Sequence, residues 1–160
     1  MRGLDGKTAI VAGGSTLIGQ SVAETLAGYG CNVVIADIAV ADGEAAAKKI
    51  GGKARFICCD LTSDADIAAL VKAAVEATGR LDYLVNVACT YLDNGADTAR
   101  ADWLKAFDVN VVGSVMLMQA ARPREDAQHV AATAYRLRRS GMSLKTGPPP
   151  ASTGQARAKD

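Results

Sequence analysis

The segment at residues 13–19, Gly-Gly-Ser-Thr-Leu-Ile-Gly, is the part of the sequence best suited to bind an anion. It follows a short apolar run and precedes a pattern in which Val22 and Leu26 repeat at helical spacing. Glycines in such a turn let backbone N–H groups approach an anion, and the helix N-terminus adds a partial positive charge. Both features suit a pyrophosphate. The predicted cofactor-binding residues of this turn are Gly13, Ser15, Thr16, Leu17, Ile18 and Gly19.

Asp37 is the second candidate, because it ends the next apolar run, 18 residues after Gly19. A carboxylate at this place accepts hydrogen bonds from ribose hydroxyls and repels a 2′-phosphate. No Arg or Lys that could bind such a phosphate lies between Asp37 and Lys48. The predicted cofactor is therefore NAD, in preference to NADP. The alternative is that Asp37 only caps the end of a strand.

Short apolar runs alternate with helical patterns and must position these residues. The predicted strands cover residues 8–12, 32–37, 54–60 and 82–88, and the predicted helices cover about 18–29, 41–50, 63–78 and 102–121. Strands that are apolar throughout and joined by helices form a parallel sheet covered on both faces. Right-handed crossovers predict the strand order 3-2-1-4, an α/β Rossmann-type doubly wound sheet. Its ligand site lies at the carboxyl ends of the strands, near residues 13–19, Asp37, Asp60 and 86–89.

The motifs, taken in order, resemble the short-chain dehydrogenase/reductase (SDR) family over about residues 4–121. The family's T-G-x-x-x-G-x-G motif falls on residues 12–19, its acidic residue on Asp37, and its N-N-A-G motif on residues 86–89. The resemblance implies that Asp60 and Leu61 contact the adenine. It also assigns Asn86, Ala88 and Cys89 to the cofactor site and Asn110 to the catalytic tetrad. The four predicted strands make the sheet incomplete relative to the SDR fold.

Three residues depart from the family pattern. Leu17 stands in place of the middle glycine, and Val87 and Cys89 replace the second Asn and the Gly of N-N-A-G. If residue 17 needs a positive φ, its side chain costs on the order of 1–2 kcal/mol, whereas an extended backbone costs nothing. The larger side chains indicate either a reshaped loop or weakened cofactor binding, and the sequence leaves both open.

The resemblance implies catalytic residues that the sequence does not supply. An SDR uses a Tyr as acid/base, a Lys four residues later that lowers the pKa of this Tyr, and an upstream Ser. After residue 121 the sequence has Tyr135 followed by Arg139, whose planar guanidinium differs from an ammonium in reach and geometry. We therefore expect an SDR-type oxidoreductase for NAD-dependent hydride transfer on an alcohol or ketone, catalytically incomplete in this chain. The alternative is a non-catalytic dinucleotide-binding or oligomerisation module.

Charge and composition divide the chain near residue 121. Residues 1–121 carry 10 Lys+Arg and 14 Asp+Glu, whereas residues 122–160 carry 8 and 3. The last 39 residues contain no Ile, Phe or Trp, so they bury too little apolar surface to offset the entropy of ordering. The sequence predicts an NAD-binding domain at 1–121 and a poorly ordered, Pro/Arg/Ala-rich tail at 122–160 with a short helix near 126–139. The tail is either native or the product of a shifted reading frame or truncated gene.

Several functional classes are excluded by composition. The chain has 160 residues, a net charge of +1 and 49% apolar residues, as expected for one globular domain. Four Cys without a C-x-x-C pair and a single His argue against a metal site and favour reduced, buried structural thiols. No signal peptide or membrane span is evident, so we expect a cytoplasmic protein. The basic patch at residues 136–139 lacks a nucleic-acid-binding motif, so we expect no nucleic-acid partner.

The predicted helix at residues 102–121 is apolar around nearly its whole circumference. A helix of this kind requires burial on every side. The sequence therefore predicts a homo-oligomer assembled through this helix, with simple burial under the sheet as the alternative. Its apolar residues are Trp103, Leu104, Phe107, Val109, Val111, Val112, Val115, Met116, Leu117 and Met118.

Overall fold

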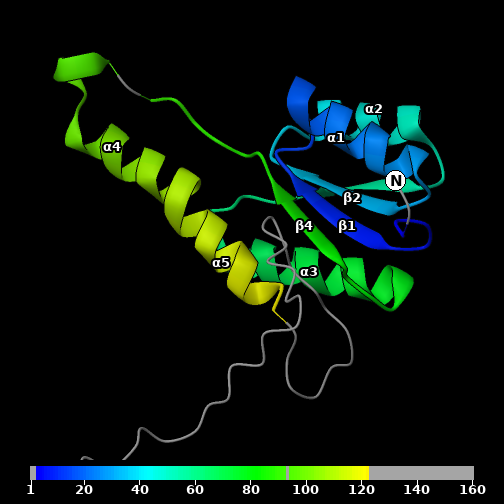
Figure 1. Cartoon of the computed structure of the whole chain (residues 1–160). Coiled ribbons are helices and arrows are strands. Elements are labelled where there is room, and N and C mark those ends of the chain that lie inside the picture. The colour runs from blue at the N-terminus through cyan, green and yellow to red at the C-terminus, as the bar shows by residue number, and fades with distance from the viewer. Residues whose placement is uncertain (1–2, 93, 123–160) are drawn as a thin grey trace, which may run out of the picture.

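The computed structural model describes residues 3–92 and 94–122. A parallel sheet in the order β3-β2-β1-β4 forms its centre, which confirms the predicted strand order (Figure 1). In register, Ala12 at the end of β1 lies beside Ala36 of β2 and Asn86 of β4. The carboxyl ends of these three strands therefore meet at one edge of the sheet. The strands are β1 (Thr8–Ala12), β2 (Asn32–Asp37), β3 (Ala54–Cys58) and β4 (Tyr83–Asn86).

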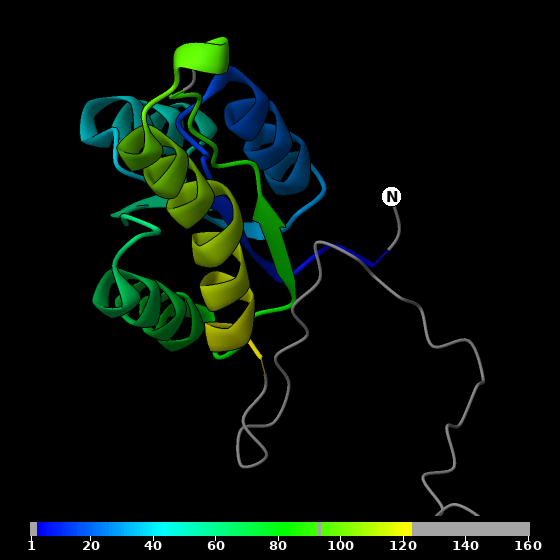
Figure 2. The same cartoon turned by 90° about the vertical axis from the view of Figure 1, so that its left-hand side faces the viewer.

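Helices cover both faces of the sheet (Figures 1 and 2). Helices α1 (Leu17–Gly28) and α2 (Val40–Ile50) lie on one face, where Val11 and Ile35 pack with Ala23 and Ala46. Helices α3 (Asp64–Thr78) and α5 (Gly113–Ala120) lie on the other face. Because successive side chains of a strand point to opposite faces, Ile10 packs there with residues of α3 and α5.

Local sequence signals fix the ends of the helices. The Ser63 hydroxyl accepts a hydrogen bond from the Asp66 backbone N–H at 3.2 Å and so caps the start of α3. Gly79 ends the same helix in the left-handed conformation, with φ at 72°. At α1, the Thr16 hydroxyl accepts from the Gly19 backbone N–H at 3.1 Å. The start of α1 is therefore held by a side chain of the glycine-rich turn.

Three predicted elements differ in length or form. Strand β3 ends at Cys58 and β4 spans only Tyr83–Asn86, so the predictions of 54–60 and 82–88 were too long. The predicted helix at 102–121 is three segments: α4 (Arg100–Phe107), a π-helical turn η2 (Asp108–Val112) and α5. A short 3-10 turn, η1 (Gly95–Asp97), precedes α4. The strands are shorter than predicted because the apolar runs continue past the last residues that pair with a neighbouring strand. The π turn was not predicted because an apolar pattern on all sides of a helix does not reveal a change in the number of residues per turn.

Close packing holds the last helix against the sheet. A Cβ at Gly113 would overlap the Leu61 carbonyl, so only glycine lets α5 approach the loop after β3 this closely. Leu117 and Ala121 are fully buried against the sheet-facing core. Seven large apolar residues of α4, η2 and α5 remain exposed, which corrects the alternative of simple burial under the sheet. We call them the outer apolar face: Trp103, Leu104, Phe107, Val111, Val112, Val115 and Met118.

The four cysteines are free, but only two of them are buried. Cys31 and Cys59 lie in the core, whereas Cys58 and Cys89 are exposed, so the prediction of four buried thiols was wrong for this second pair. Cys58 is exposed because β3 is an edge strand, and Cys89 because it follows the end of β4. Burial raises the pKa of the Cys31 thiol to about 11 and that of Cys59 to about 12.

The predicted tail lies outside the described residues, and so do its helix at 126–139, Tyr135, Arg139 and the basic patch at 136–139. Within residues 3–92 and 94–122, no helix is long and apolar enough to cross a membrane.

Candidate functional site

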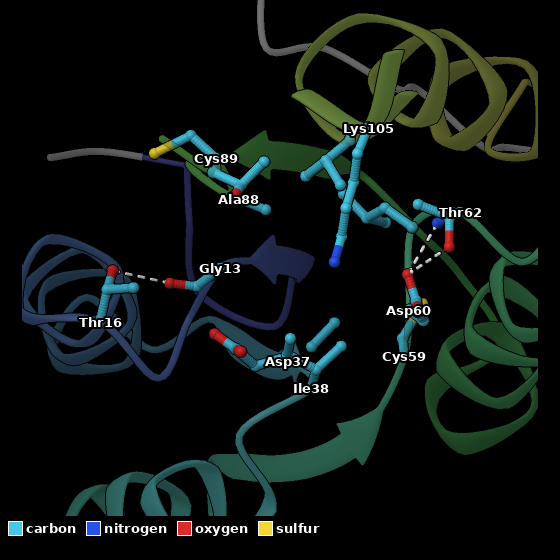
Figure 3. Close-up of a pocket in the computed structure, with 14 residues that line it drawn as sticks. Gly13, Thr16, Asp37, Ile38, Cys59, Asp60, Thr62, Ala88, Cys89 and Lys105 are labelled. Atoms are coloured by element: carbon cyan, nitrogen blue, oxygen red, sulfur yellow. Dashed lines mark hydrogen bonds between the residues drawn. The ribbon is translucent and has the colours of Figure 1, made fainter. Parts of the chain in front are cut away.

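A cavity of about 330 Å³ opens at the carboxyl edge of the sheet (Figure 3). Seven of the predicted cofactor-binding residues line it, from all four strand ends. They are Gly13, Thr16, Asp37, Asp60, Leu61, Ala88 and Cys89. The lining also includes residues that sequence analysis did not select: Ala36, Ile38, Cys59, Thr62, Thr90, Lys105 and Val109. The structure thus brings together segments that lie up to 96 residues apart along the chain.

The glycine-rich turn is held in one conformation by its own contacts. Gly13 has φ at 74°, and a Cβ there would overlap the backbone of Ala88, so this position requires glycine. The Thr16 hydroxyl donates to the Gly13 carbonyl at 2.8 Å and accepts from Gly19 N–H. Gly19 therefore packs under the turn and does not line the cavity.

Two backbone N–H groups at the start of α1 are available for a ligand. The N–H groups of Ser15, Thr16 and Gly19 each have an acceptor. Among the residues that the structure describes, those of Leu17 and Ile18 have no recorded acceptor. Unpaired N–H groups at a helix N-terminus bind anions, because the helix dipole adds to their own positive ends.

Leu17 is the first residue of α1, so its backbone is helical. The strain considered for a positive φ at this position therefore does not arise. Its side chain is 89% exposed and that of Ile18 is 69% exposed, and neither lines the cavity. Neither of these two predicted residues therefore lines the cavity; their backbone N–H groups lie at the start of α1, next to the lining residue Thr16.

The carboxylate of Asp37 is fixed at the edge of the cavity by two backbone donors. Oδ2 accepts from Ser15 N–H at 3.0 Å, and Oδ1 accepts from Ala39 N–H at 3.1 Å. Ser15 thus supports Asp37 and does not itself line the cavity. Asp37 therefore caps backbone groups, as the alternative from sequence has it, and it also lines the cavity.

Asp60 lies opposite, in the loop after β3. Its Oδ1 accepts from the Thr62 backbone N–H at 2.9 Å and from the Thr62 hydroxyl at 2.8 Å. These bonds hold the pKa of Asp60 below its usual value, and the charge of Lys105 adds a smaller lowering. Asp60 is therefore a rigid, ionised acceptor. The role of Thr62 could have been suspected from the sequence, because an Asp side chain often accepts from the backbone N–H two residues later in a turn. This pattern is too common to single out a functional residue.

Asn86 and Asn110 do not line the cavity but hold the loop that follows β4. The Asn86 amide donates to the Ser114 hydroxyl at 2.7 Å and accepts from Ala88 N–H at 3.0 Å. The Asn110 side chain accepts from Thr90 N–H at 2.8 Å and donates to the Thr90 carbonyl at 2.9 Å. Both predicted residues thus tie the cavity-lining residues Ala88 and Thr90 to η2 and α5.

The cavity offers two carboxylate acceptors, Asp37 and Asp60, to hydroxyl or amine groups, and the adjoining start of α1 offers two N–H donors to an anion. This donor set fits a dinucleotide, whose phosphates need donors and whose ribose and adenine need acceptors. In residues 3–92 and 94–122, no cluster of three or more His, Cys, Asp or Glu could hold a metal ion.

The comparison with known families agrees with this geometry. The family model described as short chain dehydrogenase matches residues 7–132. This chain belongs to the short-chain dehydrogenase family. It is 36% identical over 121 residues to 2,5-dichloro-2,5-cyclohexadiene-1,4-diol dehydrogenase of Sphingobium indicum, a match that covers 74% of this chain and 48% of that protein. It is 32% identical over 133 residues to the 3-hydroxyacyl-CoA dehydrogenase type-2 of Drosophila melanogaster, covering 74% and 52%.

A solved structure of the family shares the fold. The 3-ketoacyl-(acyl-carrier-protein) reductase of Brucella melitensis, complexed with NADH, superimposes with a TM-score of 0.68 at 30% sequence identity. The match covers 73% of this chain and 49% of that reductase. The chain spans about half the length of the curated relatives that it matches.

Proposed function

We propose that this chain binds NAD in the cavity at the carboxyl edge of the sheet. The observation that carries the proposal is the pairing of two unengaged N–H groups, at Leu17 and Ile18, with the fixed carboxylate of Asp37. The N–H groups would hold the pyrophosphate, and Asp37 would accept hydrogen bonds from the ribose hydroxyls. Asp60 and Leu61 would hold the adenine, and Ala88 and Cys89 would border the nicotinamide half.

NAD is preferred over NADP in this proposal because of charge. A 2′-phosphate would lie against Asp37, whose carboxylate is held in place by Ser15 and Ala39 and cannot turn away without losing both bonds. The next residue, Ile38, also lines the cavity and offers no positive charge. The NADH complex of the similar reductase shows that a relative takes the reduced form of this cofactor.

We further propose that the whole protein is an SDR-type oxidoreductase that acts on an alcohol or ketone. When bound, NAD supplies the hydride acceptor, and the residues of this chain bind and orient it. The relatives named above are dehydrogenases of a cyclohexadiene diol and of a 3-hydroxyacyl-CoA. In the part of the chain that the structure describes, Asn110 alone belongs to the predicted tetrad. The second candidate is a chain that binds the dinucleotide without turning it over, because Arg139 stands four residues after Tyr135, where an SDR has a Lys.

Thermal melting with NAD, and with NADP for comparison, tests the binding proposal. NAD at 100 times its Kd should stabilise the fold by about 2.7 kcal/mol, because it binds only the folded chain. NADP at the same concentration should stabilise it less. A turnover assay on a panel of alcohols then separates the two candidates: stabilisation without turnover supports the non-catalytic one. No shift of Tm at millimolar NAD would contradict both.

We also propose that the chain forms a homo-oligomer through the outer apolar face. The rings of Trp103 and Phe107 pack in a tilted arrangement on this face, with centroids 6.3 Å apart, and both remain about half exposed. A patch of large apolar side chains along one helix is typical of a surface that a second protein covers. Light scattering at micromolar concentration should give a dimer or larger species, and a monomer would contradict the proposal.

A further inference from the structure

Lys105 reaches into the cavity from α4, a helix that sequence analysis did not connect with the cofactor. Figure 3 shows its ammonium directed into the cavity, between Gly13 and Asp60. Val109 lines the same wall. Lys105 belongs to α4, and Val109 belongs to η2, the π-helical turn that continues it. These two segments therefore close the cavity opposite the strand ends.

The ammonium of Lys105 faces Asp60 without being paired to it. Its charge contributes to the low pKa of Asp60. Among the described residues, however, none of the ion pairs includes Lys105. Oδ1 of Asp60 is engaged by Thr62, and no hydrogen bond to Oδ2 is recorded in residues 3–92 and 94–122. A positive donor and a negative acceptor thus face each other across open space, both free to bind a ligand.

This pair matches the edge of an adenine base. The exocyclic amine of adenine is a donor, and the ring nitrogen beside it is an acceptor. A carboxylate beside an ammonium presents the complementary pattern. A phosphate fits this part of the cavity less well, because it would lie against Asp60, and the donors suited to a phosphate are at Leu17 and Ile18.

We propose that Lys105 is a specificity-determining residue of the adenine subsite: its ammonium donates to a ring nitrogen of the base while Asp60 accepts from the amine. The inference rests on the proposed binding of NAD and adds a residue to it. Binding would also connect α4, which has no buried residue of its own, to the sheet through the ligand.

Calorimetric titration of Lys105→Met with AMP, ADP and NAD tests the assignment. The three ligands share the base but differ in charge. A contact with the base predicts the same rise in Kd, about tenfold, for all three. A rise that grows with the negative charge of the ligand, largest for ADP and smallest for NAD, would assign Lys105 to the phosphates and overturn the proposal.

Matched variants complete the experiment. Lys72→Met on α3 removes the same charge from an exposed lysine that pairs with Glu76 and does not line the cavity, and it should leave all three Kd values unchanged. Lys105→Arg keeps the charge and should lose less affinity than Lys105→Met. An unchanged Kd in Lys105→Met overturns this inference alone, whereas a wild-type chain that binds none of the three overturns the proposed function as well.

Discussion

Asn110 of the π-helical turn brackets the backbone of Thr90, accepting from its N–H at 2.8 Å and donating to its carbonyl at 2.9 Å. The two residues lie on different elements, one in η2 and the other in the loop after β4. This pair of bonds copies the pattern of a strand ladder with a side-chain amide in place of a second backbone. It sets the position of Thr90, which lines the cavity, relative to the helix that supplies Lys105.

Replacing Asn110 should loosen this connection. Asn110→Ala removes both bonds and should lower the free energy of unfolding by about 1 kcal/mol, toward the low end for two hydrogen bonds because the residue is exposed. Asn110→Asp keeps the acceptor but loses the donor, so its loss should be smaller. Urea unfolding measures both. Asn94→Ala is the control, because this exposed asparagine makes no side-chain hydrogen bond to any residue that the structure describes. An equal loss there would argue against a stabilising role of the two Asn110–Thr90 bonds.

The choice between NAD and NADP should depend on the charge of Asp37. Asp37→Asn keeps an oxygen for one of the two backbone donors but removes the negative charge. We expect weaker binding of NAD and stronger binding of NADP. The ratio of the two Kd values should fall about tenfold, because a loss of ~1.4 kcal/mol of repulsion between Asp37 and the 2′-phosphate changes a Kd tenfold. Calorimetry with both cofactors measures the ratio. Asp42→Asn on α2 changes the net charge of the chain by the same amount and is the control. A similar change in the ratio of the two Kd values in this variant would show that the effect does not depend on the position of Asp37.

Local patterns predicted the sheet and the first half of the site because both depend on neighbours in sequence. The glycine turn, the cap at Ser63 and the acidic residue at the end of β2 each act within a few residues. Lys105 could not be predicted, because its place in the cavity depends on how α4 packs 45 residues after Asp60. The π turn was missed for a different reason. The π turn adds a residue to one turn of a helix that is apolar around nearly its whole circumference, so the spacing of the apolar residues does not reveal it.

Leu17 should limit the affinity for NAD. Its backbone N–H is one of the two proposed pyrophosphate donors, and its side chain projects into solvent at the same helix start. Leu17→Gly removes that bulk, so we expect a lower Kd for NAD. We also expect a lower Tm, because glycine costs up to about 1 kcal/mol in a helix. Val40→Gly, at the first position of α2, should lower Tm without changing the Kd. An unchanged Kd in Leu17→Gly would show that the side chain leaves room for the cofactor.

The four thiols should divide into two reactive and two inert ones. At pH 8, Cys31 and Cys59 stay protonated as well as buried, since burial raises their pKa values to about 11 and about 12. Iodoacetamide should therefore modify only Cys58 and Cys89, as peptide mass mapping would show. NAD should slow the reaction at Cys89, which lines the cavity, and leave Cys58 unchanged as the internal control. Equal protection of both would indicate a general stabilisation and not occupancy of the cavity.

Assembly should depend on the outer apolar face. Val115 lies on α5 in this face and is 39% exposed, so a charge there reaches solvent in the single chain. Val115→Glu should convert the oligomer to a monomer, because an unpaired carboxylate is costly to bury in an interface. Tyr29→Glu places the same charge on an equally exposed residue after α1 and should leave the mass unchanged. Light scattering gives the mass and circular dichroism checks the fold. A Val115→Glu variant that stays oligomeric while folded would move the interface to another surface, whereas a monomer that still binds NAD would show that the cavity is complete within one chain.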